Sequence, residues 1–175
     1  MARTRSDALL LGEWACLAVL AQAPAHGYDV ALRLAPAGDI GRVWSLSRSL
    51  TYRALDQLAQ RDLIAPIAEE KGKAGGLRTI LAPTKEGKAA VKRWLREPVS
   101  HIRDVRGELL LKLVLSEDPG PLLEAQRARF APVVDALAST GGRKPATDPV
   151  AVWRYESSRA VLRFIDRLTE ERPAP

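Results

Sequence analysis

The chain has 175 residues, a net charge of +6 and 46% apolar residues, a composition that is typical of globular proteins and excludes a wholly disordered chain. Its single cysteine excludes an internal disulfide and a multi-cysteine metal site, and two histidines cannot make a histidine-rich one. The excess positive charge lies in residues 1–100, which carry 15 Lys and Arg against 10 Asp and Glu. This distribution favours an acidic partner such as nucleic acid.

The first predicted helix covers about residues 8–23 and is apolar on nearly every side, with Asp7 as its expected N-cap. A helix without a polar face must be covered all round, so we expect one side to pack on its own domain and the other on the C-terminal half or a second subunit. The run follows Arg3 and Arg5, as in a signal peptide, but Glu13 interrupts it and it is too short to span a bilayer. We therefore expect a soluble, cytoplasmic protein without membrane association.

Turn residues from Pro24 to Gly27 precede a second helix that ends near Pro36, and a third helix is predicted from Ser49 to about Arg61. The third helix is amphipathic at 100° per residue. Its packing flank is expected to hold Leu50, Ala54, Leu55 and Leu58, and its open flank Ser49, Tyr52, Arg53, Asp56 and Gln60.

Two strands are predicted next, at residues 63–68 and 78–82, with a loop over residues 69–77 between them. Pro66 indicates that the first of them lies at a sheet edge. Thr84 is the expected cap of a further helix. Beyond it we expect helices at residues 106–115 and 121–137, a Gly/Pro/Lys linker at 141–147, and a last helix that starts at Asp148-Pro149.

This order predicts a mainly α-helical fold with a small β-hairpin. Residues 1–97 form a winged helix-turn-helix DNA-binding domain, and residues 98–175 form a C-terminal helical dimerisation region. The open flank of the third helix and the charged hairpin are then the DNA-binding surface, although each alone is also compatible with ordinary solvated surface. The predicted DNA-binding residues are Arg48, Ser49, Tyr52, Arg53, Lys71, Lys73 and Arg78.

Arg53 suits either a phosphate or the edge of a guanine, whereas Ser49 and Tyr52 suit phosphate oxygens. The hairpin cations suit phosphates or a minor groove, where the potential is negative. The Gly72-x-x-Gly75 spacing is no P-loop, because the Lys-Ser/Thr ending is missing.

The apolar first helix and the apolar stripe of the last helix predict a homodimer. The residues expected in its interface are Leu10, Trp14, Leu17, Trp153, Val161, Phe164, Ile165 and Leu168. If these helices pack across the dimer, Trp14 and Trp153 line a space for a small, flat aromatic effector, with plain core packing as the alternative.

No catalytic residue, metal ligand or cofactor is predicted. His26 is expected to bond locally within its turn, and Cys16 to be a buried small hydrophobe. Two distant histidines, one cysteine and no motif-spaced carboxylate pair do not make the convergent titratable site that an enzyme needs.

The sequence resembles the PadR-like family of bacterial transcriptional regulators over most of residues 8–97. The motifs that carry the resemblance are Leu11-Gly12-Glu13-Trp14, Pro24-Ala25-His26-Gly27-Tyr28, Ser47-Arg48-Ser49-Leu50-Thr51-Tyr52-Arg53-Ala54-Leu55, Leu58, Leu63-Ile64, Glu69-Glu70, Gly72, Arg78, Thr84-Lys85-Glu86-Gly87 and Trp94-Leu95.

The resemblance implies a winged-helix fold, a homodimer clasped by the C-terminal helices in the longer-tailed branch of the family, and repression that a small molecule relieves. It also implies that the protein is not an enzyme. The family often has Ser-Pro-Gly-Thr-Leu-Tyr before the recognition helix, where this chain has Arg48, Ser49 and Thr51 in place of Pro, Gly and Leu. An operator sequence therefore cannot be carried over.

The sequence thus favours a sequence-specific DNA-binding regulator, a homodimeric repressor released by a small molecule. Two alternatives stay open: a DNA-binding regulator without a small-molecule effector, and an interaction module that binds no DNA.

Overall fold

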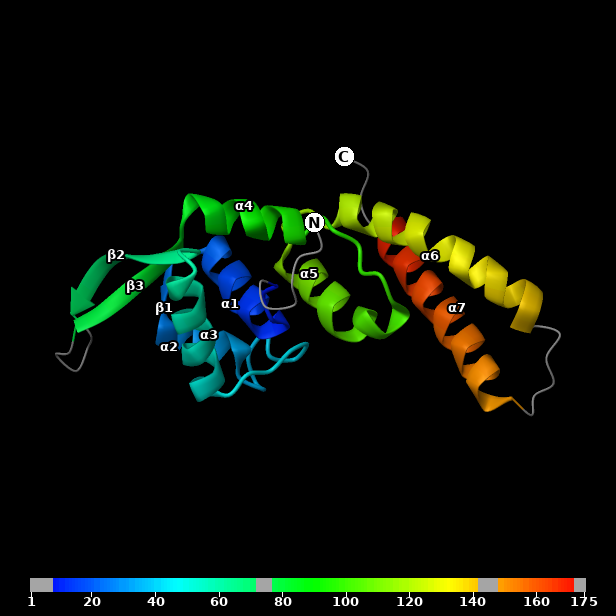
Figure 1. Cartoon of the computed structure of the whole chain (residues 1–175), viewed down its shortest axis with the longest axis horizontal. Coiled ribbons are helices and arrows are strands. Elements are labelled where there is room, and N and C mark those ends of the chain that lie inside the picture. The colour runs from blue at the N-terminus through cyan, green and yellow to red at the C-terminus, as the bar shows by residue number, and fades with distance from the viewer. Residues whose placement is uncertain (1–7, 72–76, 142–147, 172–175) are drawn as a thin grey trace. The chain divides into compact units, whose positions relative to one another are not determined.

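A computed structural model of the chain describes residues 8–71, 77–141 and 148–171, and it divides into two compact units, residues 1–95 and 96–175. The first unit contains α1 (Leu11–Gln22), β1 (Ala25–His26), α2 (Gly27–Leu34), α3 (Arg48–Gln60), β2 (Ile64–Lys71), β3 (Leu77–Pro83) and α4 (Lys85–Trp94) (Figure 1). The second contains a 3-10 turn (Ile102–Asp104), a π-helical turn (Val105–Leu109), α5 (Leu110–Leu115), α6 (Gly120–Gly141) and α7 (Pro149–Glu170). The assignment of these parts to DNA binding and dimerisation stays a prediction.

The first unit has the predicted winged helix-turn-helix order of elements. Helix α1 is its centre, because α2, α3, α4 and β3 all pack against it. Residues 15–20 of this helix are buried on every side, which explains why the sequence shows no polar face there. The expected second cover for α1 therefore comes in large part from its own unit. The predicted N-cap Asp7 lies outside the described residues, and the described helix begins after Leu10.

A three-stranded antiparallel sheet of order β1-β3-β2 forms the wing, whose hairpin extends away from α1–α3 (Figure 1). Pro66 lies on the edge strand β2, as predicted, with a register shift between Pro66 and Ala68. The hairpin is longer than expected: Glu69 and Glu70 pair with β3 instead of belonging to the loop. The two-residue strand β1 was not predicted, because so short a segment has no detectable alternation.

Helix α4 begins at the predicted cap. The Thr84 hydroxyl accepts a hydrogen bond from the Gly87 amide at 3.1 Å and donates one to the Asp62 carbonyl at 2.8 Å. Gly87 is required here for space, because a Cβ at this position would lie 2.0 Å from the Leu63 carbonyl oxygen. The cap and this close approach fix where α4 leaves the sheet.

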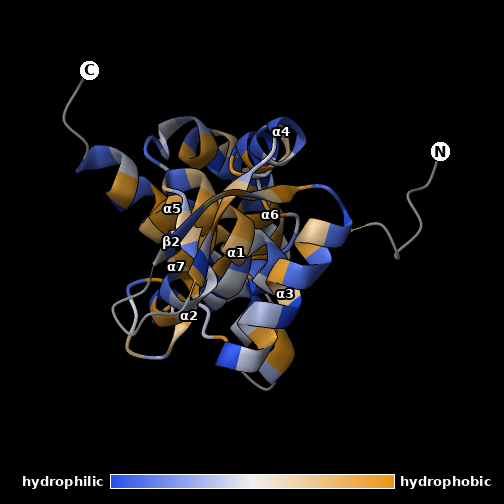
Figure 2. Cartoon of the chain, turned by 90° about the vertical axis from the view of Figure 1, so that its left-hand side faces the viewer, coloured by the Kyte–Doolittle hydropathy of each residue, from blue (hydrophilic) through white to orange (hydrophobic). Residues whose placement is uncertain are grey.

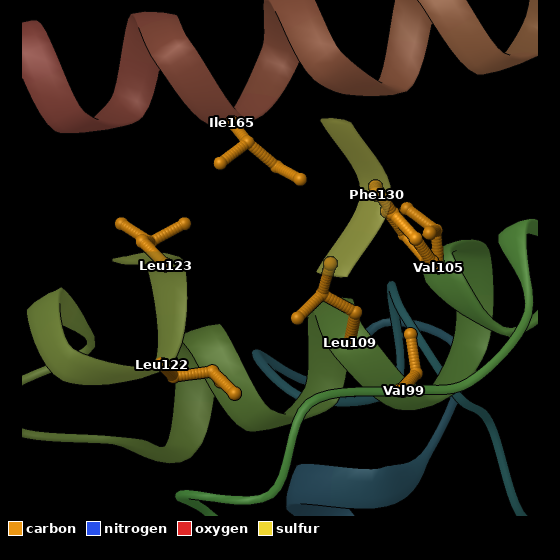
Figure 3. Packing of buried hydrophobic residues seen from close by; sticks show 7 residues of the cluster. All are labelled: Val99, Val105, Leu109, Leu122, Leu123, Phe130 and Ile165. Atoms are coloured by element: carbon orange, nitrogen blue, oxygen red, sulfur yellow. The ribbon is translucent and has the colours of Figure 1, made fainter. Parts of the chain in front are cut away.

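The second unit has its own apolar core, made by Val99, Val105, Leu109, Leu122, Leu123, Phe130 and Ile165 (Figure 3). Helices α6 and α7 pack on each other, and α7 starts at the predicted cap, where Asp148 accepts from the Ala151 amide at 3.1 Å. The predicted linker at 141–147 lies almost wholly outside the described residues.

A buried polar contact closes this core. The Gln126 side chain accepts from the Val99 amide at 2.7 Å and donates to the Val99 carbonyl at 3.0 Å, so both amide functions are satisfied away from water. Lys112, also buried, pairs with Glu108 at 2.6 Å and donates to the Glu97 carbonyl. Across the described part of the chain, no helix is both long and apolar enough to cross a membrane.

Candidate nucleic-acid interface

Helix α3 presents a polar, exposed face. Every side chain predicted for its open flank is exposed, as is that of Arg48 at the first helical position; the exposed residues are Arg48, Ser49, Tyr52, Arg53, Asp56 and Gln60. Figure 2 shows hydrophilic and apolar residues interleaved along this helix, as expected for an amphipathic segment. The face offers guanidinium, hydroxyl and phenol groups, which are donors to phosphates and base edges.

The opposite flank of α3 corrects one prediction. Ala54, Leu55 and Leu58 are buried as expected, but Leu50 is 50% exposed and Thr51 occupies the buried position instead. Residues 51, 54, 55 and 58 share one face of a helix with 3.6 residues per turn, whereas Leu50 lies to its side. Thr51 is compatible with burial because its hydroxyl donates to the Ser47 carbonyl at 3.1 Å.

The N-cap of α3 is Ser47, two residues before the predicted start of the helix at Ser49. Its hydroxyl accepts from the Leu50 amide at 3.3 Å and lies 3.1 Å from the Ser49 hydroxyl. The two hydroxyls thus lie together at the positive end of the helix dipole, an arrangement that suits a phosphate oxygen.

The guanidinium of Arg48 lies over the rings of two tyrosines. Its guanidinium carbon lies 5.2 Å from the ring centre of Tyr28 and 5.8 Å from that of Tyr52, within cation–π range of both. Tyr28 belongs to α2 and both other residues to α3, so the contact joins the two helices of the helix-turn-helix. Sequence reasoning did not place Tyr28 in the interface, because nothing in the linear pattern indicates which residue of α2 meets α3.

The described part of the wing carries charges of both signs. Arg78 is exposed on β3 opposite Glu70, and Lys71 ends β2 opposite Leu77. Lys73 lies outside the described residues. Glu69 and Glu70 directly precede Lys71 at the end of β2, so the wing is less uniformly basic than its lysines suggest.

His26 does not bond locally, contrary to the prediction. Its Nδ1 lies 3.1 Å from the Thr79 carbonyl oxygen on β3, and its Nε2 lies 3.5 Å from the Glu70 carboxylate. Since a carbonyl only accepts, this geometry requires the proton on Nδ1. The side chain is 16% exposed, so His26 fastens the start of α2 to the wing.

The second unit contains an apolar groove of about 1220 Å³ between the turn at residues 100–106, α6 and α7. Apolar lining comes from residues such as Phe130, Val133 and Phe164. Three arginines, Arg103, Arg106 and Arg154, also line it, and none of the described lining residues carries a carboxylate. The groove therefore suits a ligand with an apolar body and a negative charge.

Apart from Trp14, the residues predicted for dimerisation divide into three groups. Leu17 and Ile165 are fully buried within the chain and need no partner to cover them. This burial corrects their expected place in the dimer interface. Val161, Phe164 and Leu168 are partly buried against the core of the second unit. Leu10, 71% exposed, and Trp153, 72% exposed, remain open to a partner.

Trp14 and Trp153, predicted to share a ligand space, lie in different units of the chain. Trp14 stacks on Trp94 of α4 with ring centres 5.2 Å apart and planes 1° from parallel, so a neighbouring indole already covers one of its faces. Trp153 lines the groove. Cys16 is buried, and burial together with the nearby Glu13 carboxylate raises the pKa of its thiol to about 12.

Among the described residues, no three His, Cys, Asp or Glu side chains come together as metal ligands. No family model and no curated protein matches the chain.

Several solved structures have a similar fold. PadR of Bacillus subtilis in complex with operator DNA is 17% identical, with 90% of this chain and 97% of that chain covered and a TM-score of 0.47. The chain is similar to PadR-like transcriptional regulators. Another such regulator, from Bacillus cereus, is 16% identical over 96% of this chain and 99% of its own, with a TM-score of 0.42. The virulence activator AphA of Vibrio cholerae is 16% identical, with 93% and 97% covered and a TM-score of 0.42.

Proposed function

We propose that the chain is a sequence-specific DNA-binding transcriptional regulator and not an enzyme. The observation that carries this proposal is the exposed donor face of α3, held next to a wing in a part of the chain with excess positive charge. A helix of this size fits the major groove of B-DNA, where Arg53 reaches a base edge or phosphate and Ser49 and Tyr52 reach phosphates. Arg78 and the lysines of the wing add backbone contacts.

Titration of fluorescent duplex DNA at several salt concentrations tests this proposal. We expect wild type to select a sequence from a randomised duplex library, and Arg53→Ala to weaken binding to that sequence by about 1–3 kcal/mol. Arg163→Ala is the matched control, because it removes an equal charge from an exposed site on α7. Equal losses in the two variants, or no duplex binding at low salt, would refute the assignment; the second result would favour an interaction module without DNA.

We further propose that the regulator acts as a homodimer through the second unit. Val133 on α6 and Val150 and Trp153 on α7 are apolar and exposed, which is costly in water unless a partner covers them. Two copies related by a twofold axis would bring two α3 helices to half-sites about 34 Å apart.

Sedimentation of Trp153→Asp tests the dimer. Because Trp153 is exposed, the charge does not disturb the core, and we expect a folded monomer. Trp44→Asp, at an exposed indole of the first unit, should leave the dimer intact. A stable wild-type monomer at micromolar concentration contradicts the proposal.

The groove supports control by a small molecule, with repression relieved when the ligand binds. The groove has a larger volume than one small ligand fills. If a second copy of the chain covered part of the groove, a closed pocket would remain. Stacking on Trp153 and pairing with Arg154 favour a flat aromatic carboxylate.

1-Naphthoate and the neutral 1-naphthylmethanol form a suitable pair of probes. We expect the carboxylate alone to quench Trp153 and to release bound DNA, and Trp153→Phe to abolish the quenching. Trp14→Phe should change nothing, because that indole is stacked on Trp94. DNA binding that no such probe affects favours a regulator without a small-molecule effector.

A further inference from the structure

Tyr28, Arg48 and Tyr52 form a contact that we call the tyrosine clamp. Its geometry restricts the orientation of the Arg48 side chain. A free arginine side chain samples many rotamers and loses about 2 kcal/mol of conformational entropy when it is fixed. In the tyrosine clamp, two rings hold the guanidinium at 5.2 and 5.8 Å from their centres before any ligand arrives. Arg48 is therefore preorganised while it remains exposed.

Gly27 positions one of the two rings. A Cβ on this residue would lie 3.0 Å from Cε1 of Tyr52 and 3.2 Å from Cδ1 of Leu55. The Tyr52 ring thus rests directly on the backbone at the start of α2, and a side chain at residue 27 would push it away. Tyr28 follows immediately in the chain, so the first turn of α2 sets both rings.

The tyrosine clamp leaves the hydrogen-bonding edge of Arg48 unused. Cation–π contact with an aromatic ring uses no hydrogen-bond acceptor, and the five N–H donors of a guanidinium lie in its plane. Within the described part of the chain, Arg48 makes no ion pair or side-chain hydrogen bond, in contrast to Arg33, whose guanidinium is bound by Asp39 at 2.6 Å. These N–H donors have a fixed spacing in one plane, so they suit two acceptor atoms of matching spacing.

We infer that Arg48 is a specificity-determining residue that binds O6 and N7 of one guanine in the operator, and that the tyrosine clamp fixes its orientation. These two acceptors on the major-groove edge match a guanidinium bidentately. A phosphate also accepts in the plane of a guanidinium, but contact with it carries no sequence preference. The inference rests on the proposed function and adds the base that α3 reads.

Selection from a randomised duplex library, with wild type and variants, tests this inference. We expect wild type to enrich one invariant guanine per half-site. Arg48→Lys keeps the charge but loses the bidentate geometry, and it should relax the preference at that position alone. Arg61→Lys, at an exposed arginine beyond the end of α3, is the matched control and should leave the selected sequence unchanged.

7-Deazaguanine at the selected position removes the N7 acceptor without altering the phosphate. We expect it to weaken wild-type binding about tenfold or more, and to have little further effect on Arg48→Lys. Tyr28→Leu, which loosens the tyrosine clamp without removing a donor to DNA from Arg48, should reduce guanine preference several-fold while it leaves low-salt binding to unrelated DNA unchanged.

The possible results distinguish a failure of the proposed function from a failure of the role of Arg48. Failure of wild type to select any sequence overturns the proposed function. The role of Arg48 is overturned, and the proposed function is not, if Arg48→Lys selects the same sequence as wild type. The same holds if 7-deazaguanine weakens the binding of both proteins equally. Either result assigns Arg48 to a phosphate.

Discussion

Gln126 offers the sharpest test of how the second unit is held together. Its side-chain amide makes two hydrogen bonds to the backbone of Val99, at 2.7 and 3.0 Å, in a buried site. In Gln126→Leu both bonds vanish, and the Val99 amide and carbonyl stay buried without partners. Unsatisfied buried groups cost about 1–3 kcal/mol each. The added apolar burial offsets part of this cost, so we expect a net loss of about 2–4 kcal/mol in the free energy of unfolding.

Gln126→Glu has nearly the same shape but depends on pH. The new carboxyl can accept from the Val99 amide, but it donates to the Val99 carbonyl only when protonated. Burial and this hydrogen bond both favour the protonated form, so its folded-state pKa is raised above the unfolded value of about 4.3. The variant is then least destabilised below that unfolded value, and it loses stability as pH rises through the folded pKa.

Urea denaturation at about pH 5 and about pH 8, with hydrogen exchange at the Val99 amide, measures both effects. Gln60→Leu and Gln60→Glu are matched controls, because Gln60 is exposed on α3. Wild-type stability and Val99 protection in Gln126→Leu would show that the two hydrogen bonds do not close this core.

Three further predictions concern the first unit. Cys16 should resist a thiol reagent at about pH 8 in the native protein and react once it is unfolded, because burial raises the pKa of its thiol to about 12; native reactivity would contradict its burial. Thr84→Ala should lower the free energy of unfolding by about 1–2 kcal/mol, since it removes the cap on Gly87, whereas Thr84→Ser should not; thermal melts decide this. The hydrogen bond from Arg33 lowers the pKa of Asp39. Arg33→Ala should therefore cost under about 1 kcal/mol at neutral pH, a difference that disappears in urea titrations as pH falls through that lowered pKa.

Local pattern was sufficient for much of this protein. The caps at Thr84 and Asp148, the edge position of Pro66 and the open flank of α3 all follow from side-chain chemistry and helical period. These features depend on residues within a few positions of one another, which a sequence displays directly. The winged helix-turn-helix follows from their order.

Contacts between distant segments required the tertiary structure. Tyr28 meets Arg48, and His26 meets Thr79, only because α2 packs on α3 and β1 pairs with β3. The sequence pattern predicts Trp14 at the dimer interface, with a ligand space or plain core packing as its role, and only the structure shows that Trp94 covers one face of its ring. The buried side of α3 includes Thr51 rather than Leu50, because the direction from which α1 and α2 approach decides which stripe is covered. Hydrophobicity along a chain shows that a helix has two faces; packing against its neighbours determines where the boundary between them falls.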